Sequence, residues 1–119
     1  MNDPRFLKAK QFDYEDLNQR LMGNPEVIRQ ILSMTREYLE TLDARLNEAL
    51  RFENLEKLRK LGHSLKGIAA SASMFRLSEL GSKLQGITDQ DKSGIAAILE
   101  EIRQEARSLL KLIAEKGNE

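Results

Sequence analysis

Several residue types are scarce in this chain of 119 residues, which has no cysteine, no tryptophan, one histidine and two prolines. Without cysteine, disulfides and thiolate chemistry are excluded, and a lone histidine excludes the familiar zinc ligand sets. Nineteen basic and nineteen acidic residues cancel, so neither nucleic acid nor a membrane is expected as a partner. No stretch approaches the roughly 20 apolar residues of a membrane span, and none resembles a secretory signal, so we expect a cytoplasmic protein.

Apolar residues recur with helical spacing, and aromatic residues make up only 5% of the chain. This pattern predicts an all-α fold, an up-down-up-down antiparallel four-helix bundle built as a single domain over residues 1–119. Residues 1–12 are expected to form an N-terminal strap, with short helical segments covering one end, and residues 116–119 a frayed tail. Helices are predicted at 13–22, 25–50, 55–73, 77–86 and 95–114.

The only histidine lies on the predicted helix 55–73, whose apolar residues define one buried stripe. At about 100° per residue from Leu58, His63 falls roughly 140° away, so its imidazole should point outward. Lys66 follows one turn on, and Gly67 leaves the outer face without a side chain. An exposed glycine inside a helix costs roughly 1 kcal/mol relative to alanine, which indicates that something must approach the histidine closely. An ordinary surface histidine beside a tolerated glycine is the alternative interpretation.

Two other glycines fall on inward faces of predicted helices. Gly62 precedes the histidine, and Gly81 lies near the apolar stripe of the helix 77–86. Because glycine allows close backbone approach, we expect both to let neighbouring helices pack tightly. Gln85 projects to one side of its helix and could lean toward the histidine, or it could be an ordinary polar surface residue.

Several enzyme classes lack their signatures in this sequence. There is no Gly-x-x-x-x-Gly-Lys-[Ser/Thr] stretch and no dinucleotide fingerprint, so nucleotide binding is unsupported. Ser64 is adjacent to His63, and adjacent helical residues do not face each other, which argues against a serine hydrolase. What remains is an exposed imidazole, a side chain that is a competent nucleophile near neutral pH, beside Lys66.

Residues 63–67 read His-Ser-Leu-Lys-Gly and are followed by the small residues 69–72. This stretch resembles the signature of histidine-containing phosphotransfer (HPt) domains, and the family pattern His-x-Leu-Lys-Gly is matched in full. In organisation the resemblance runs over about 13–113. Two positions depart from the family, since Ser73 stands where glycine is common and Gly62 stands where alanine often precedes the histidine.

The resemblance implies a phosphorelay intermediate without an ATP site or kinase activity of its own. His63 would accept a phosphoryl group from a receiver-domain aspartate and pass it to another receiver domain. Lys66 would stabilise the phosphoryl oxygens, and Gly67 would give steric access. Gln85, at a position that is commonly Glu or Gln in the family, would orient the histidine by a hydrogen bond.

The expected partners are receiver domains of response regulators or hybrid histidine kinases. They would supply the Mg²⁺, because the chain shows no cofactor or metal site of its own, and the protein itself is expected to be a monomer. Two alternatives stay open. A histidine-kinase dimerisation domain usually has an acidic residue after the histidine and a proline soon after, and Ser64 and the proline-free helix disfavour it. A helical adaptor that keeps the motif without using it is the other.

Overall fold

The computed structural model describes residues 10–117, except for the side chains of 91, 92 and 117. Within this range every regular element is helical, which confirms the all-α prediction. The elements are α1 (Tyr14–Arg20), α2 (Pro25–Arg51), α3 (Leu55–Ser71), α4 (Phe75–Gln85), the 3₁₀ turn η2 (Asp89–Asp91) and α5 (Lys92–Gly117). None of the described helices is long and apolar enough to cross a bilayer.

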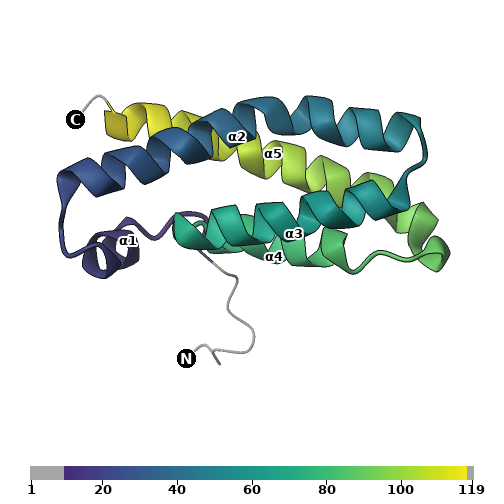
Figure 1. Ribbon diagram of the computed structural model, residues 1–119, viewed down its shortest axis with the longest axis horizontal. Coiled ribbons are helices and arrows are strands. Elements are labelled where there is room, and N and C mark those ends of the chain that lie inside the picture. Colours follow the sequence, from purple (N-terminus) through teal and green to yellow (C-terminus); the bar gives the residue numbers. More distant parts are fainter. Residues whose placement is uncertain (1–9, 118–119) are drawn as a thin grey trace.

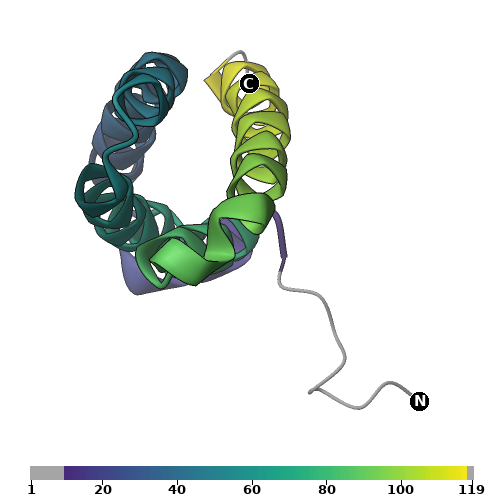
Figure 2. The ribbon, with the colours of Figure 1, turned by 90° about the vertical axis from the view of Figure 1, so that its right-hand side faces the viewer.

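The long helices α2 to α5 alternate in direction along the molecule (Figure 1). Seen from one end, they follow one another around the bundle in chain order, with α3 between α2 and α4 (Figure 2). Consecutive helices contact each other, and α2 also contacts α5. The short helix α1 lies at the end where α2 begins and α3 ends (Figure 1). The helix α3 is therefore held on three sides, by α2, by α4 and at its C-terminal end by α1.

The predicted stripe of α3 forms part of the core. Leu58, Leu65, Ala69 and Ala72 are buried, and Leu61 is partly buried against the same cluster. Apolar side chains of the other helices complete this core, which confirms the helical phase taken from the sequence. The largest fully buried apolar side chains include Leu17, Leu42, Leu46, Met74, Leu77, Leu84, Leu99, Ile102 and Leu109.

Polar side chains begin the first three helices. Asp13 accepts a hydrogen bond from the backbone N–H of Asp16, and Asn54 accepts one from Lys57. Asn24 accepts from two backbone N–H groups, with Pro25 at the first helical position. These contacts satisfy amide groups that have no partner inside the helix, and so they fix where each helix starts.

Some predicted boundaries were wrong. The residues from Met74 to Arg76 were expected to be a turn, but α4 already begins at Phe75, and α3 ends at Ser71. Ser73 has a φ of +58°, so the chain reverses there and leaves Met74 to begin the next helix. The turn η2 likewise leads directly into α5, which starts at Lys92 rather than Ile95 and continues to Gly117, beyond the predicted end.

The predicted N-terminal strap lies only partly in the described range, because residues 1–9 fall outside it. The backbone carbonyl of Lys10 accepts a hydrogen bond from the Arg76 amide, with the two atoms 3.0 Å apart. The Gln11 amide donates to the Ser108 hydroxyl over 2.7 Å, and Phe12 packs against the core. Residues 10–12 therefore run along α4 and α5. Of the predicted tail, 116–117 are still helical and 118–119 lie outside the described residues.

Candidate functional site

His63 is exposed on the outer face of α3, as its helical phase predicts. Its neighbours Leu65 and Gly62 are buried, so the backbone at this point is fixed while the imidazole faces outward. The side chain borders an open hollow at the α3–α4 boundary. The residues that line this hollow are Glu56, Arg59, Lys60, His63, Ser64 and Gln85.

The helices α3 and α4 touch backbone to backbone beside the histidine. A Cβ atom added at Gly62 would lie 2.4 Å from the backbone nitrogen of Gln85, and one added at Gly81 would lie 2.7 Å from the backbone nitrogen of Lys66. No side chain fits in either space, which confirms the predicted close packing at both glycines. The Ser78 hydroxyl adds a hydrogen bond to the Lys66 carbonyl over 2.9 Å. This contact is a further link between α3 and α4.

The close approach places Gln85 against the histidine. Its side-chain nitrogen Nε2 lies 3.1 Å from Nδ1 of His63. A carboxamide turned by 180° presents its oxygen instead, and which end faces the ring depends on the imidazole tautomer. When the Gln85 oxygen accepts a hydrogen bond from Nδ1–H of His63, the lone pair on Nε2 of His63 points away from Gln85. In that state the imidazole is oriented and its Nε2 is free to act as a nucleophile.

Lys66 and Gly67 complete the outer face of the helix after the histidine. Both are exposed, and a Cβ atom added at Gly67 would meet nothing within 4 Å. The Lys66 ammonium makes no ion pair with any side chain that the structure describes. The structure thus brings Gln85 to the imidazole and leaves the surface around Gly67 open.

Sequence reasoning did not single out Arg59, which also lines the hollow. Its Nη1 donates to the Ile87 carbonyl over 3.2 Å, so the half-buried guanidinium bridges from α3 to the end of α4. The i, i+4 spacing to His63 was the signal available in the sequence, since residues so spaced share a helix face. The contact with Ile87 depends on the tertiary packing and could not be read from the sequence.

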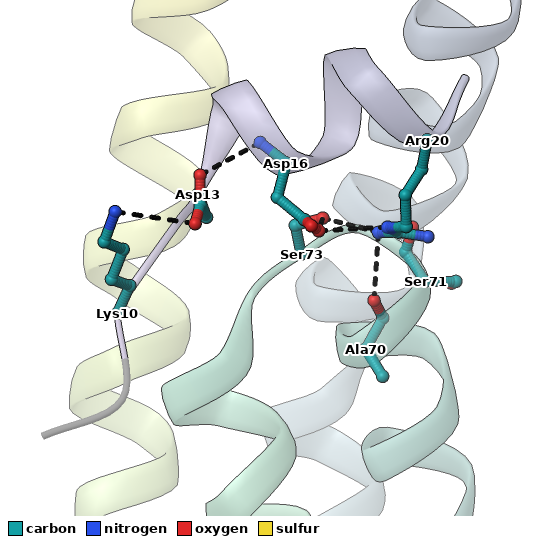
Figure 3. Close-up of polar contacts among 7 residues, drawn as sticks. All are labelled: Lys10, Asp13, Asp16, Arg20, Ala70, Ser71 and Ser73. Atoms are coloured by element: carbon teal, nitrogen blue, oxygen red, sulfur yellow. Dashed lines mark hydrogen bonds and ion pairs between the residues drawn. The ribbon is translucent and has the colours of Figure 1, made fainter. Parts of the chain in front are cut away.

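A polar cluster at the other end of α3 was also missed (Figure 3). The Ser73 hydroxyl donates to the Asp16 carboxylate over 2.7 Å, and the Arg20 guanidinium donates to the Ser73 hydroxyl. The same guanidinium reaches the carbonyls of Ala70 and Ser71, at 3.3 and 3.2 Å. The Ser73 hydrogen bond, with the neighbouring Arg20, lowers the pKa of Asp16. These contacts join α1 to the C-terminal end of the histidine helix and satisfy its last carbonyls.

The described residues hold no group of three His, Cys, Asp or Glu side chains that could bind a metal ion. A family model described as the Hpt domain matches residues 26–115, which is most of the chain. No curated protein and no solved structure matches the chain. The matched range contains α3, α4 and every residue that lines the hollow.

Proposed function

The chain belongs to the Hpt-domain family, whose function is histidine phosphotransfer in phosphorelay signalling, and we propose that His63 is the residue that carries the phosphoryl group. The family membership also makes receiver domains the class of partner. One observation supports His63 above all others, namely the exposed imidazole held through Nδ1 by Gln85. It is the only histidine in the chain.

In the proposed reaction, the Nε2 lone pair of His63 attacks the phosphorus of a receiver aspartyl phosphate. The Nε2–P bond forms as the P–O bond to the aspartate breaks, and the aspartate leaves as a carboxylate. The Gln85 oxygen accepts from Nδ1–H and stabilises the positive charge that develops on the ring. The reverse sequence, with a second receiver aspartate as nucleophile, passes the phosphoryl group onward.

The residues after the histidine have separate proposed roles. The Lys66 ammonium, one helical turn from the imidazole, pairs with phosphoryl oxygens as charge develops on them. Gly67 leaves the surface beside the ring without a protruding side chain, so that a receiver can approach. Phosphoryl transfer depends largely on positioning and charge neutralisation, and these two residues supply both without a covalent role.

A Mg²⁺ ion supplied by the receiver would neutralise charge on the transferring group, and it forms part of the proposal. The monomeric state, the cytoplasmic location and the choice between response regulators and hybrid kinases as partners stay predictions. The kinase-dimerisation alternative predicts ATP-dependent labelling in the presence of a kinase ATP-binding domain, whereas our proposal predicts labelling only from a phosphorylated receiver. The adaptor alternative predicts receiver binding without transfer in the native protein.

The test of the proposal is the variant His63→Gln, mixed with a phosphorylated receiver. We expect complete loss of phosphoryl acceptance and a melting temperature close to that of the parent, because an exposed side chain contributes little to the core. Ser64→Ala, which changes the next exposed residue, should transfer normally and serves as the matched control. An acid-labile, base-stable phosphate on the His63→Gln protein would contradict the assignment.

A further inference from the structure

The hollow beside the imidazole lies toward the N-terminal end of α3 from His63. Side chains on a helix lean toward its N-terminus, so the ring covers the turn that contains Arg59 and Lys60. Both residues line the hollow, whereas Lys66 does not. A phosphoryl group on a ring nitrogen that faces this hollow would therefore meet these two cations first.

The two cations differ in whether a carboxylate pairs with them. The Lys60 ammonium lies 3.3 Å from the Glu56 carboxylate, one turn earlier on the same helix. Arg59 makes no ion pair with any described carboxylate. Its one hydrogen bond among the described residues is from Nη1 to the Ile87 carbonyl. Arg59 is thus the cation of this hollow whose charge is not offset by an ion pair with any described carboxylate.

The guanidinium is also held in place before any ligand arrives. The Ile87 side chain is buried, so the carbonyl that anchors Arg59 belongs to a fixed part of the chain just after α4. Nη1 uses one N–H group in this contact, and the other donors of the planar fork stay available. A fork whose orientation is already restricted loses less entropy when it binds phosphoryl oxygens than a free lysine does.

We infer that Arg59 is a second phosphoryl-binding residue, which contacts the phosphoryl oxygens on phosphorylated His63 from the side of the hollow. The inference rests on the proposed function, because it requires that His63 is phosphorylated. Arg59 stabilises the phosphorylated form relative to the receiver aspartyl phosphate through charge-assisted hydrogen bonds. It acts from the side of the ring opposite to Lys66.

The experiment measures the equilibrium of phosphoryl transfer from one phosphorylated receiver to the full chain. We expect Arg59→Ala to lower the equilibrium constant about three- to tenfold, as a partly exposed charge-assisted contact would. Arg59→Lys should lie between the parent and Arg59→Ala. Two controls, Lys60→Ala and Ser78→Ala, should each change it less than about twofold. Lys60→Ala removes a cation that is paired with a carboxylate, and Ser78→Ala removes an uncharged hydrogen bond between α3 and α4.

A second readout does not depend on any variant. The NMR signal of the Arg59 side-chain Nε–H should shift when His63 of the wild-type protein becomes phosphorylated. This measurement tests the role of Arg59 even if Arg59→Ala does not fold. An unchanged signal, an unchanged equilibrium in Arg59→Ala, or an equal loss in either control would overturn the role of Arg59. A wild-type protein that takes no phosphoryl group on His63 would overturn the proposed function itself. That result is visible before any Arg59 variant is measured.

Discussion

Two glycines on α3 lie in opposite surroundings. At Gly62 an added Cβ atom would collide with the backbone of α4, 2.4 Å from the Gln85 amide nitrogen, whereas at Gly67 it would meet nothing within 4 Å. The first glycine is needed because another helix is already there. The second lies in open space, where a residue with higher helix propensity would be favoured, and under the proposed function it leaves room for the receiver that approaches.

The comparison separates a fixed region of the site from an open one. The Gly62 side holds Gln85 at 3.1 Å from the imidazole, and so it sets the orientation of the ring. On the Gly67 side, an added Cβ atom meets none of the described residues. A change on the inner face should therefore affect both stability and transfer, and a change on the outer face should affect transfer alone.

Gly62→Ala should have the largest effect. The methyl group cannot fit against the backbone of α4, so the two helices must separate, and overpacking of this kind lowers the free energy of unfolding by about 1–3 kcal/mol. Separation would also withdraw Gln85 from the imidazole and slow transfer. Urea unfolding and the transfer rate from a phosphorylated receiver measure the two effects.

The matched control for this change is Gln85→Leu, which removes the contact with His63 while leaving the helices packed. It should slow transfer with little loss of stability. If Gly62→Ala is as stable as the parent, the backbone contact between α3 and α4 is looser than the distances indicate.

The sequence predicted much of this region because helical phase alone separates inward from outward positions. Gly62, Gly81 and the outward His63 follow from residue spacing, and the structure agrees with all three. Helix ends were harder. Only the left-handed backbone of Ser73 explains why α4 begins at Phe75, and serine gives no strong signal for such a conformation.

Contacts between distant parts of the chain could not be predicted. Arg20 and Ser73 lie 53 positions apart, and Gln11 and Ser108 lie 97 apart. No local sequence pattern predicts such a contact, because the contact depends on how the helices pack. The contact between Gln85 and His63 was anticipated from the side of its helix on which Gln85 lies and from the family resemblance, but the contact between Arg59 and Ile87 could not be anticipated.

Gly67→Gln tests the open side of the comparison. Glutamine has a higher helix propensity than glycine. The variant should therefore be at least as stable as the parent, with a gain in the free energy of unfolding of up to somewhat under 1 kcal/mol. Its side chain would stand in the path of a receiver and should slow transfer markedly, with Gly67→Ala between the two. Thermal unfolding and transfer rates are measured together. Full-speed transfer in a stabilised Gly67→Gln protein would mean that the open surface has no role in docking.

Lys66→Ala sharpens the boundary between the two sides. The Lys66 backbone packs against Gly81 and accepts from Ser78, but its side chain is exposed, so alanine changes only the outer face. We expect an unchanged melting temperature and transfer slowed about three- to tenfold at low salt, with a smaller difference at higher salt. Rates equal to those of the parent at both salt concentrations would show that Lys66 is an ordinary surface charge.

Ser73 adds a third case, a position where backbone conformation alone would favour glycine. Its φ of +58° strains a serine by roughly 1 kcal/mol relative to glycine. The buried hydroxyl offsets this strain by joining the Asp16 carboxylate to the Arg20 guanidinium. Replacing serine by glycine removes the strain and the bridge together, so the two effects oppose each other and the net change near neutral pH should be small.

Ser73→Gly therefore shows its effect mainly in the pH dependence of stability. The Ser73 hydrogen bond and Arg20 hold the pKa of Asp16 in the folded protein below its usual value. This contribution to stability is present above the unfolded pKa and is lost as the pH falls through the folded one. Without the hydroxyl the pKa should move back toward normal, so the parent should lose stability relative to the variant as the pH drops below about 4. Urea unfolding across this range measures the difference, and Asp16→Asn, which cannot titrate, is the control. Parallel curves for the parent and Ser73→Gly would show that the serine is no more than a strained substitute for glycine.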